Sequence, residues 1–138
     1  MKKIAIVNGI NLGELGTREV DVYGHTDFHT YLDVLKKRYP NIDLLYFQSN
    51  KVDELVDFML QHKQCDGMIL NPGAFTHTSV ILADTIAAIS AKVIEVHISN
   101  LFGRENFRKN SIIASKCCGS ISGFGLSGYE MALYYLSH

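Results

Sequence analysis

The chain has 138 residues and a formal net charge of −1, and 47% of its residues are hydrophobic while 20% are charged. These values are typical of a soluble globular protein, and the length predicts a single domain, residues 1–138, with a substantial core. The low net charge argues against nucleic acid or an anionic membrane surface as the main partner. Three cysteines suggest no disulfide framework, and no apolar run approaches the roughly 18 residues of a membrane span, so we expect a cytoplasmic protein.

Short apolar runs alternate along the chain with segments of helical spacing. The runs read as buried parallel strands, the last of them weaker than the others, at 3–8, 42–48, 67–71, 92–98 and 119–123. Helices are predicted from near Thr26, over 52–60, over 81–89 and over 126–136. This alternation predicts an α/β fold, a flavodoxin-like, doubly wound, five-stranded parallel sheet with helices on both faces.

The first strand is followed by an unusually long connection, Asn8–Gly24, which contains four glycines. Such connections normally take about 2–6 residues, and longer ones in small domains are usually binding loops or lids. This loop carries Arg18 and Tyr23. A tyrosine with its ordinary pKa of about 10 is a useful base at neutral pH only if a cation stabilises its anion, and Arg18, Arg104 and Arg108 are the candidates. The alternative is that the Tyr23 ring only packs.

Glu95 and His97 lie two residues apart near the end of the fourth strand. Their side chains therefore point to the same face, at the edge of the sheet where ligands bind in α/β proteins. A carboxylate beside an imidazole fixes its tautomer and stabilises the imidazolium, which favours His97 as a proton carrier. A purely structural pair is the alternative.

The third strand leads into a polar segment, Asn71–Ser79, with a Pro-Gly turn at its start. Thr76 or Thr78 is expected to cap the following helix, whose first N–H groups suit an anionic ligand. Asn71 and His77 are candidates for hydrogen bonds to hydroxyl or carboxylate groups. This segment, too, could be a helix start without a ligand.

Two other kinds of function remain open at this point. One is a non-catalytic, flavodoxin-like module that binds flavin or a phosphorylated ligand, although no dinucleotide or P-loop signature is present. The other is a thiol hydrolase that pairs Cys65 or Cys117 with His97. His25 and His29 are four residues apart but have no third ligand at a suitable spacing, so no metal is expected.

Four blocks of sequence, in order, resemble type II 3-dehydroquinate dehydratases nearly from end to end. They are Asn-Gly-x-Asn-Leu-x-x-Leu-Gly-x-Arg-Glu with Tyr-Gly in 8–24, Asn-Pro-Gly-Ala-x-x-His-Thr-Ser in 71–79, Val-Ile-Glu-Val-His-x-Ser-Asn with Arg-Glu-x-Phe-Arg in 93–108, and Gly-Phe-Gly with Gly-Tyr-x-x-Ala-Leu in 123–133. The resemblance implies anti elimination of water from 3-dehydroquinate through an enolate, in the shikimate pathway of aromatic amino acid biosynthesis. It implies no cofactor, metal or lysine Schiff base, and a homo-oligomer, a dodecamer built from four trimers.

The resemblance also implies roles by position. Tyr23, as tyrosinate, would remove the C2 proton, and His97 would protonate the departing C1 hydroxyl. Arg18 would stabilise the transition state, and Asn11 would act through water at the enolate oxygen. Glu95 would orient His97. The substrate-binding positions would be Asn71, His77, Ile98, Ser99, Arg108, Arg104 on a mobile lid, and Asp84 reaching the site of a neighbouring subunit.

Overall fold

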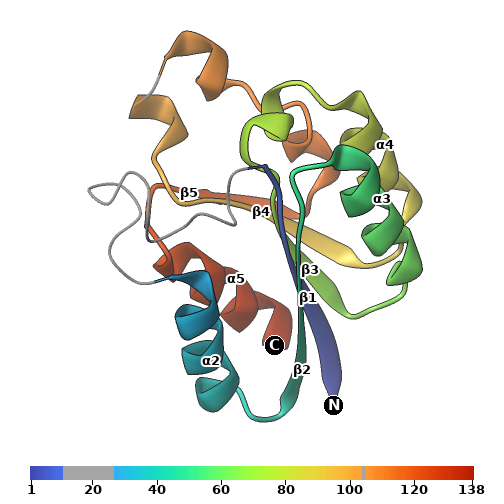
Figure 1. The fold of residues 1–138 in the computed structure, drawn as a ribbon, viewed down its shortest axis with the longest axis vertical. Helices are drawn as coiled ribbons and strands as arrows, with labels where there is room; N and C mark the ends of the chain where they lie inside the picture. Colours follow the sequence, from blue (N-terminus) through green and yellow to red (C-terminus); the bar gives the residue numbers. More distant parts are fainter. Residues whose placement is uncertain (11–26, 104) are drawn as a thin grey trace.

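Five strands form one parallel sheet in the order β2-β1-β3-β4-β5 (Figure 1). The structure is a computed structural model that describes residues 1–10, 27–103 and 105–138. The strands are β1 (Lys2–Asn8), β2 (Ile42–Gln48), β3 (Gly67–Asn71), β4 (Lys92–His97) and β5 (Gly119–Ser122). The chain runs outward from β1 to β2 and then returns to the other side of β1 to form β3. Successive strands are therefore added in opposite directions on the two sides of the β1–β3 pair. This topological switch point confirms the predicted flavodoxin-like fold.

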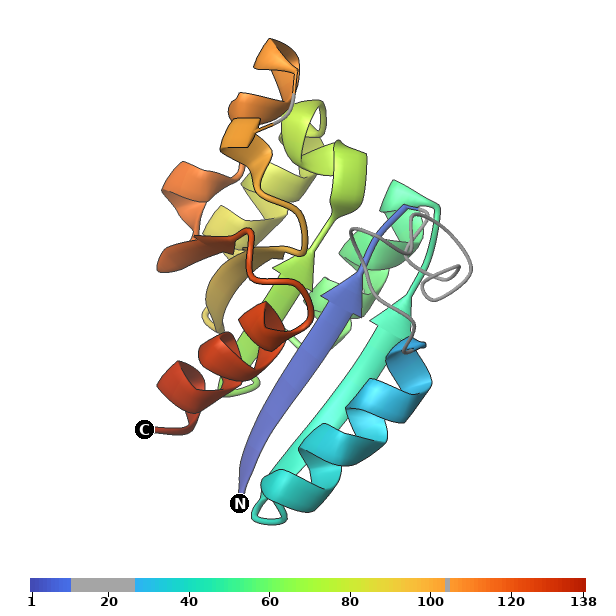
Figure 2. The ribbon, with the colours of Figure 1, turned by 90° about the vertical axis from the view of Figure 1, so that its left-hand side faces the viewer.

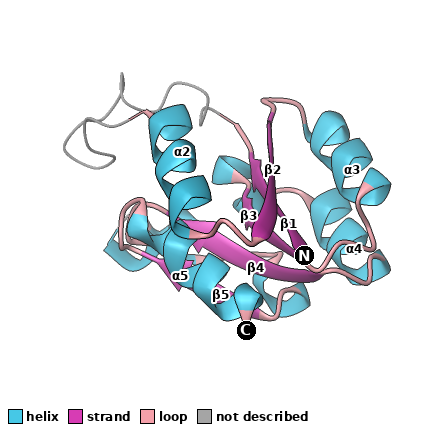
Figure 3. Ribbon diagram, turned by 90° about the horizontal axis from the view of Figure 1, so that it is seen from below, coloured by secondary structure: helices cyan, strands magenta, loops and turns pink. Residues whose placement is uncertain are grey.

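The described α-helices cover both faces of this sheet, as Figures 2 and 3 show. They are α2 (Phe28–Arg38), α3 (Val52–Gln61), α4 (Val80–Ala88) and α5 (Ser127–Ser137). On one face, α2 and α5 pack against Ile4 and Ile6 of β1. On the other face, α3 and α4 pack against Ala5 and Val7 of the same strand. The alternation along β1 is that expected for a strand buried on both sides.

The predicted boundaries agree closely with the structure. The bounds of β2 and β3 are those predicted, and the bounds of the other three strands differ by one residue at one end, which is within the usual ambiguity of strand ends. The predicted cap of α4 is wrong. Ser79, rather than Thr76 or Thr78, accepts the hydrogen bond from Leu82 N, at 3.1 Å. The preceding residues form a short 3-10 helix, η2 (Gly73–His77), which turns the Thr76 hydroxyl toward β4 instead.

The ends of β1 and β3 approach each other through main-chain contacts. Gly9 N donates to Asn71 O at 2.7 Å, and a Cβ atom at Gly9 would lie only 2.4 Å from Pro72 O. Gly73 has a φ of 63°, which favours glycine because it lacks a Cβ atom. These glycines bring the start of the long connection beside Asn71.

At the opposite edge of the sheet, the first strand and the last helix meet. Lys2 Nζ donates to Leu136 O at 3.2 Å, and Figure 1 shows both ends of the chain on this side. Within the part of the chain that the structure describes, no helix has the length and apolar character that crossing a membrane requires.

Candidate active site

Polar side chains are buried at the carboxyl ends of β1, β3 and β4, beside the topological switch point between β1 and β3. Asn8 and Asn71 are the last residues of β1 and β3, and Glu95 and His97 lie at the end of β4. Each of these four residues is at most 4% exposed. Buried polar groups at the carboxyl ends of parallel strands mark the position at which α/β proteins bind ligands.

Glu95 and His97 lie side by side, as the period of the strand predicts. His97 Nε2 is 2.5 Å from Glu95 Oε2, and Glu95 is 0% exposed. Since a carboxylate can only accept, Nε2 carries the proton of this hydrogen bond. The other ring nitrogen of His97, Nδ1, is therefore the one left to exchange a proton with a ligand.

Three hydroxyl groups surround the carboxylate of Glu95. Thr76 Oγ1 donates to Oε2 at 2.6 Å, Ser111 Oγ to Oε2 at 2.8 Å, and Ser120 Oγ to Oε1 at 3.4 Å. Burial by itself raises the pKa of Glu95, but hydrogen bonds from His97, Thr76 and Ser111 outweigh it and hold that pKa below its usual value. Glu95 is thus an anion at neutral pH and stabilises a positive charge on His97.

Asn71 is held in one orientation by a second buried network. Its Nδ2 donates to Tyr129 Oη at 2.8 Å, and its Oδ1 accepts from Gly73 N at 3.2 Å. Tyr129 Oη in turn donates to Asn8 Oδ1 at 2.8 Å, and Asn8 Nδ2 donates to Tyr46 Oη at 3.3 Å. Burial raises the pKa of Tyr129 far above its usual value, so this tyrosine is a neutral structural phenol and no candidate for a base.

Four other predicted substrate-binding residues are described by the structure. Three lie near the ends of β3 and β4, and the fourth lies on α4. His77 closes η2, and its Nδ1 donates to Asn110 O at 2.6 Å. Ile98 is buried and Ser99 partly buried, directly after β4. Asp84 is exposed on α4, as a residue that acts on a neighbouring subunit has to be, although that interface stays a prediction.

Several predicted residues fall outside what the structure describes. Asn11, Arg18, Tyr23 and Arg104 lie outside the described residues, and for Arg108 only the backbone is described, in the 3-10 helix η4 (Asn106–Lys109). The proposed base and its cations therefore stay predictions.

Sequence reasoning missed the roles of Thr76, Ser111 and Tyr129. Thr76 was expected to cap a helix. Ser111 gave no signal, because its partner lies 16 residues away and serines are common on surfaces. Tyr129 belongs to the Gly-Tyr-x-x-Ala-Leu block, which marked it as part of the resemblance but said nothing of its partners.

The cysteines do not favour a thiol nucleophile. Burial, reinforced by the charge of Glu95, raises the pKa of Cys117 to about 12, and burial also raises the pKa of Cys65. Because the thiolate is the nucleophile, both thiols are weakly reactive at neutral pH. Among residues 1–10, 27–103 and 105–138, no three His, Cys, Asp or Glu side chains gather as a metal site would require.

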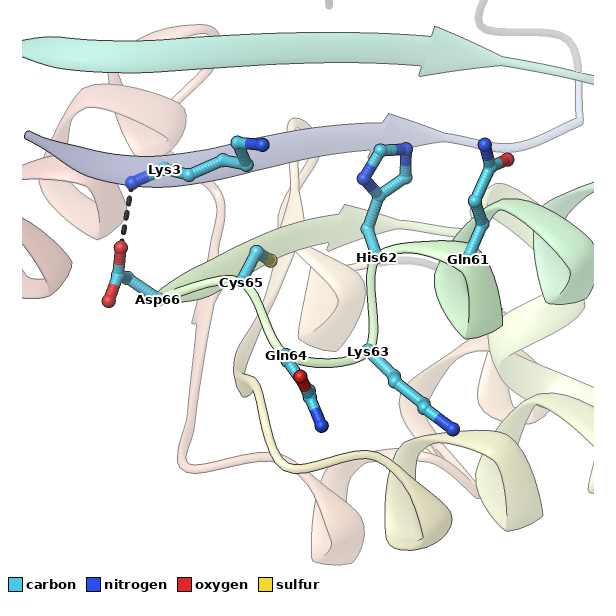
Figure 4. Close-up of a pocket in the computed structure, with 7 residues that line it drawn as sticks. All are labelled: Lys3, Gln61, His62, Lys63, Gln64, Cys65 and Asp66. Atoms are coloured by element: carbon cyan, nitrogen blue, oxygen red, sulfur yellow. Dashed lines mark hydrogen bonds between the residues drawn. The ribbon is translucent and has the colours of Figure 1, made fainter.

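A separate pocket lies between α3 and β3, at the amino edge of the sheet (Figure 4). It is lined by residues 61–66 and by Lys3, whose backbone N–H donates to Asp66 Oδ2 at 2.7 Å. Apart from the partly buried His62 and Cys65, its lining residues are exposed, and no described residue of the predicted substrate site lines it. The predicted pair Glu95–His97 lies instead at the carboxyl edge, at the end of β4.

The fold and the buried carboxylate–imidazole pair define an α/β protein equipped for general acid–base chemistry at the carboxyl edge of its sheet. A family model described as Dehydroquinase class II matches residues 2–137. The chain belongs to the type II dehydroquinase family. This confirms the family predicted from the sequence and, with it, the predicted class of enzyme, a lyase that eliminates water.

Individual relatives agree over almost the whole chain. The 3-dehydroquinate dehydratase of Caldicellulosiruptor saccharolyticus is 48% identical over 142 residues, which cover 99% of this chain and 97% of that one. The enzyme of the same name from Bacillus pumilus is 48% identical, with 99% and 95% covered. Among solved structures, the type II dehydroquinase from Butyrivibrio crossotus has a TM-score of 0.95 at 38% identity, covering 99% and 98% of the two chains. That from Propionibacterium acnes has a TM-score of 0.94 at 35% identity, covering 99% and 97%.

Proposed function

We propose that this chain removes water from 3-dehydroquinate to give 3-dehydroshikimate, a step of the shikimate pathway. One observation carries the proposal. A chain that is 48% identical to a 3-dehydroquinate dehydratase over nearly its whole length places a buried Glu95–His97 pair at the carboxyl edge of the sheet. The chemistry required is proton removal beside a ketone and protonation of a poor leaving group.

His97 is the general acid of this elimination. Glu95 accepts the Nε2 proton and, as an anion, stabilises the imidazolium, so that the Nδ1 proton is available to the departing C1 hydroxyl. After that proton has been transferred, the neutral ring keeps its Nε2–H on Glu95 and stays in place. The pair thus provides an acid that is oriented before the substrate arrives.

Tyr23 is the base in this proposal, and Arg18 stabilises its anion and the transition state. The enolate that forms when the C2 proton leaves is stabilised through water held by Asn11. The support for these roles is the spacing of the three residues in the first block of the family resemblance. It is strengthened by Tyr129, which burial keeps neutral and which therefore does not compete for the role of base.

Substrate hydroxyl and carboxylate groups are bound by the ends of β3 and β4 and by the segment after β4. The residues proposed for this are Asn71, His77, Ile98, Ser99, Arg104 and Arg108. Asn71 supports the assignment most directly, because one of its two Nδ2 protons and its Oδ1 are already used inside the protein. The amide is fixed, and a remaining N–H is available to a ligand.

The chain assembles as a dodecamer of four trimers in this proposal, and it acts in the cytoplasm. The exposed side of α4 supports assembly, since Val80 is 63% and Ile81 60% exposed there, beside Asp84. Apolar side chains grouped on a surface favour burial against another molecule. Light scattering behind gel filtration measures the assembly, and a monomer at micromolar concentration would contradict it.

The decisive test of the function is turnover of 3-dehydroquinate, followed by the near-ultraviolet absorbance of the conjugated enone product. We expect turnover by the purified protein without added metal or cofactor. Folded protein that forms no enone over a range of pH would refute the proposal. A bound chromophore in the visible spectrum would instead support a flavin-binding module.

A further inference from the structure

Two hydroxyl groups from separate segments meet on one oxygen of Glu95. Thr76, which is fully buried in η2, donates to Oε2 at 2.6 Å, and Ser111, which follows η4, donates to the same oxygen at 2.8 Å. His97 Nε2 lies 2.5 Å from this oxygen as well. One carboxylate oxygen therefore receives three donors.

The protons of this cluster can be counted. Thr76 Oγ1 and Ser111 Oγ lie 2.8 Å apart, and Ser111 Oγ also accepts from Ala114 N at 3.2 Å. Each hydroxyl has a single proton, so when both donate to Glu95 none is left between the two oxygens. A carboxylate anion accepts strongly from several donors at once, whereas a carboxylic acid accepts more weakly and brings a proton of its own. The cluster therefore favours the ionised form of Glu95.

The residues on either side of Ser111 also attach the segment after β4 to η2. Ile112 N donates to Thr76 O at 2.9 Å, and His77 Nδ1 donates to Asn110 O at 2.6 Å. Ser111 thus sits between two further contacts with η2. Arg108, the predicted substrate arginine, precedes this attachment by only a few residues, so we expect the attachment to constrain the backbone of its segment.

We propose that Thr76 and Ser111 are positioning residues of the elimination, which hold Glu95 ionised and aimed at His97 and fix the Arg108 segment to the same carboxylate. The inference rests on the proposed function, since its effect is exerted through His97. Thr76 acts mainly on the acid, whereas Ser111 acts on the acid and on substrate binding.

The test compares kcat and KM as functions of pH for wild type, Thr76→Val, Thr76→Ser and Ser111→Ala. Thr78→Val, an exposed position at the end of η2, is the matched control and should behave like wild type. Thr76→Val keeps the shape of the side chain and removes one donor to a charged group. We expect its kcat to fall about ten- to a hundredfold with KM little changed. Thr76→Ser, which restores the hydroxyl, should recover most of kcat.

The pH profile supplies a readout that a loss of packing would not give. Removing a donor lets Glu95 take up a proton more readily, so kcat should decline further relative to wild type as the pH falls, which moves the acid limb to higher pH. The titratable groups that face Glu95 are His97 and Cys117, and burial raises the pKa of Cys117 to about 12, so this thiol stays neutral throughout. Ser111→Ala should show the same shift together with a higher KM.

The outcomes separate this inference from the function itself. If wild type does not turn over 3-dehydroquinate, the proposed function fails. If wild type is active and Thr76→Val keeps its kcat and acid limb, the positioning role is refuted while the function stands. Thr76→Ser that is as slow as Thr76→Val would also refute it, because shape rather than the hydroxyl would then matter. Should Thr76→Val fail to fold by circular dichroism, Ser111→Ala decides the question, and an unshifted acid limb there overturns the inference.

Discussion

Tyr129→Phe is expected to destabilise the protein although it removes a single oxygen atom. The ring keeps its edge-on contact with Phe28, at 4.9 Å between centroids, so the change is confined to the hydroxyl. That hydroxyl accepts from Asn71 and donates to Asn8, each at 2.8 Å. Asn71 is 3% and Asn8 0% exposed, so water does not readily replace the lost partner.

The magnitude follows from these two bonds. Each lost bond contributes about 1 kcal/mol, and a buried polar group left without a partner costs about 1–3 kcal/mol. Because the hydroxyl no longer has to be desolvated itself, we expect a net loss of about 2–4 kcal/mol. With a urea dependence of about 2 kcal/mol per molar, this lowers the midpoint of unfolding by about 1–2 M.

The assay is urea unfolding followed by far-ultraviolet circular dichroism, at one protein concentration because assembly shifts apparent stability. Tyr135→Phe is the matched control, since Tyr135 lies on the same helix and is 60% exposed. Its midpoint should stay close to that of wild type. If Tyr129→Phe unfolds at the same urea concentration as Tyr135→Phe, the buried network contributes nothing to stability and the reasoning is wrong.

Three further predictions concern the reaction. Tyr23→Phe should lose turnover by about a hundred- to ten-thousandfold while still binding substrate in a titration calorimeter, and an active variant would show that the base lies elsewhere. Glu95→Gln replaces the carboxylate that accepts the His97 Nε2 proton with a neutral amide, so kcat should fall about ten- to a hundredfold, and an unchanged kcat would count against the pair. Borohydride added with substrate should leave the enzyme active because no imine forms, whereas inactivation would indicate a lysine.

Periodicity predicted most of the fold and the central pair of the site. The bounds of β2 and β3 followed from apolar runs that end at polar or turn residues, and the contact of Glu95 with His97 followed from the two-residue period of a strand. These features are local, so a single sequence contains them. They do not depend on which distant segments meet.

The features that sequence reasoning missed depend on distant partners. Thr76 lies 19 residues from Glu95, to which its hydroxyl donates, and Ser79 rather than Thr76 caps α4. Tyr129 lies 58 residues from Asn71 and 121 from Asn8, so nothing near it in the chain indicates a polar network. Hydroxyl groups are especially hard to assign, because capping, surface exposure and buried donation all suit the same residue types.

The contact between Lys2 and Leu136 has a practical consequence for engineering. It places the beginning of β1 and the end of α5 side by side at the amino edge of the sheet, on the far side from Glu95 and His97. A short peptide could join the two ends, and new ends could then be opened in a surface connection such as the one between α2 and β2. For the same reason, a tag or fusion partner attached at either end leaves the edge that carries Glu95 and His97 unobstructed.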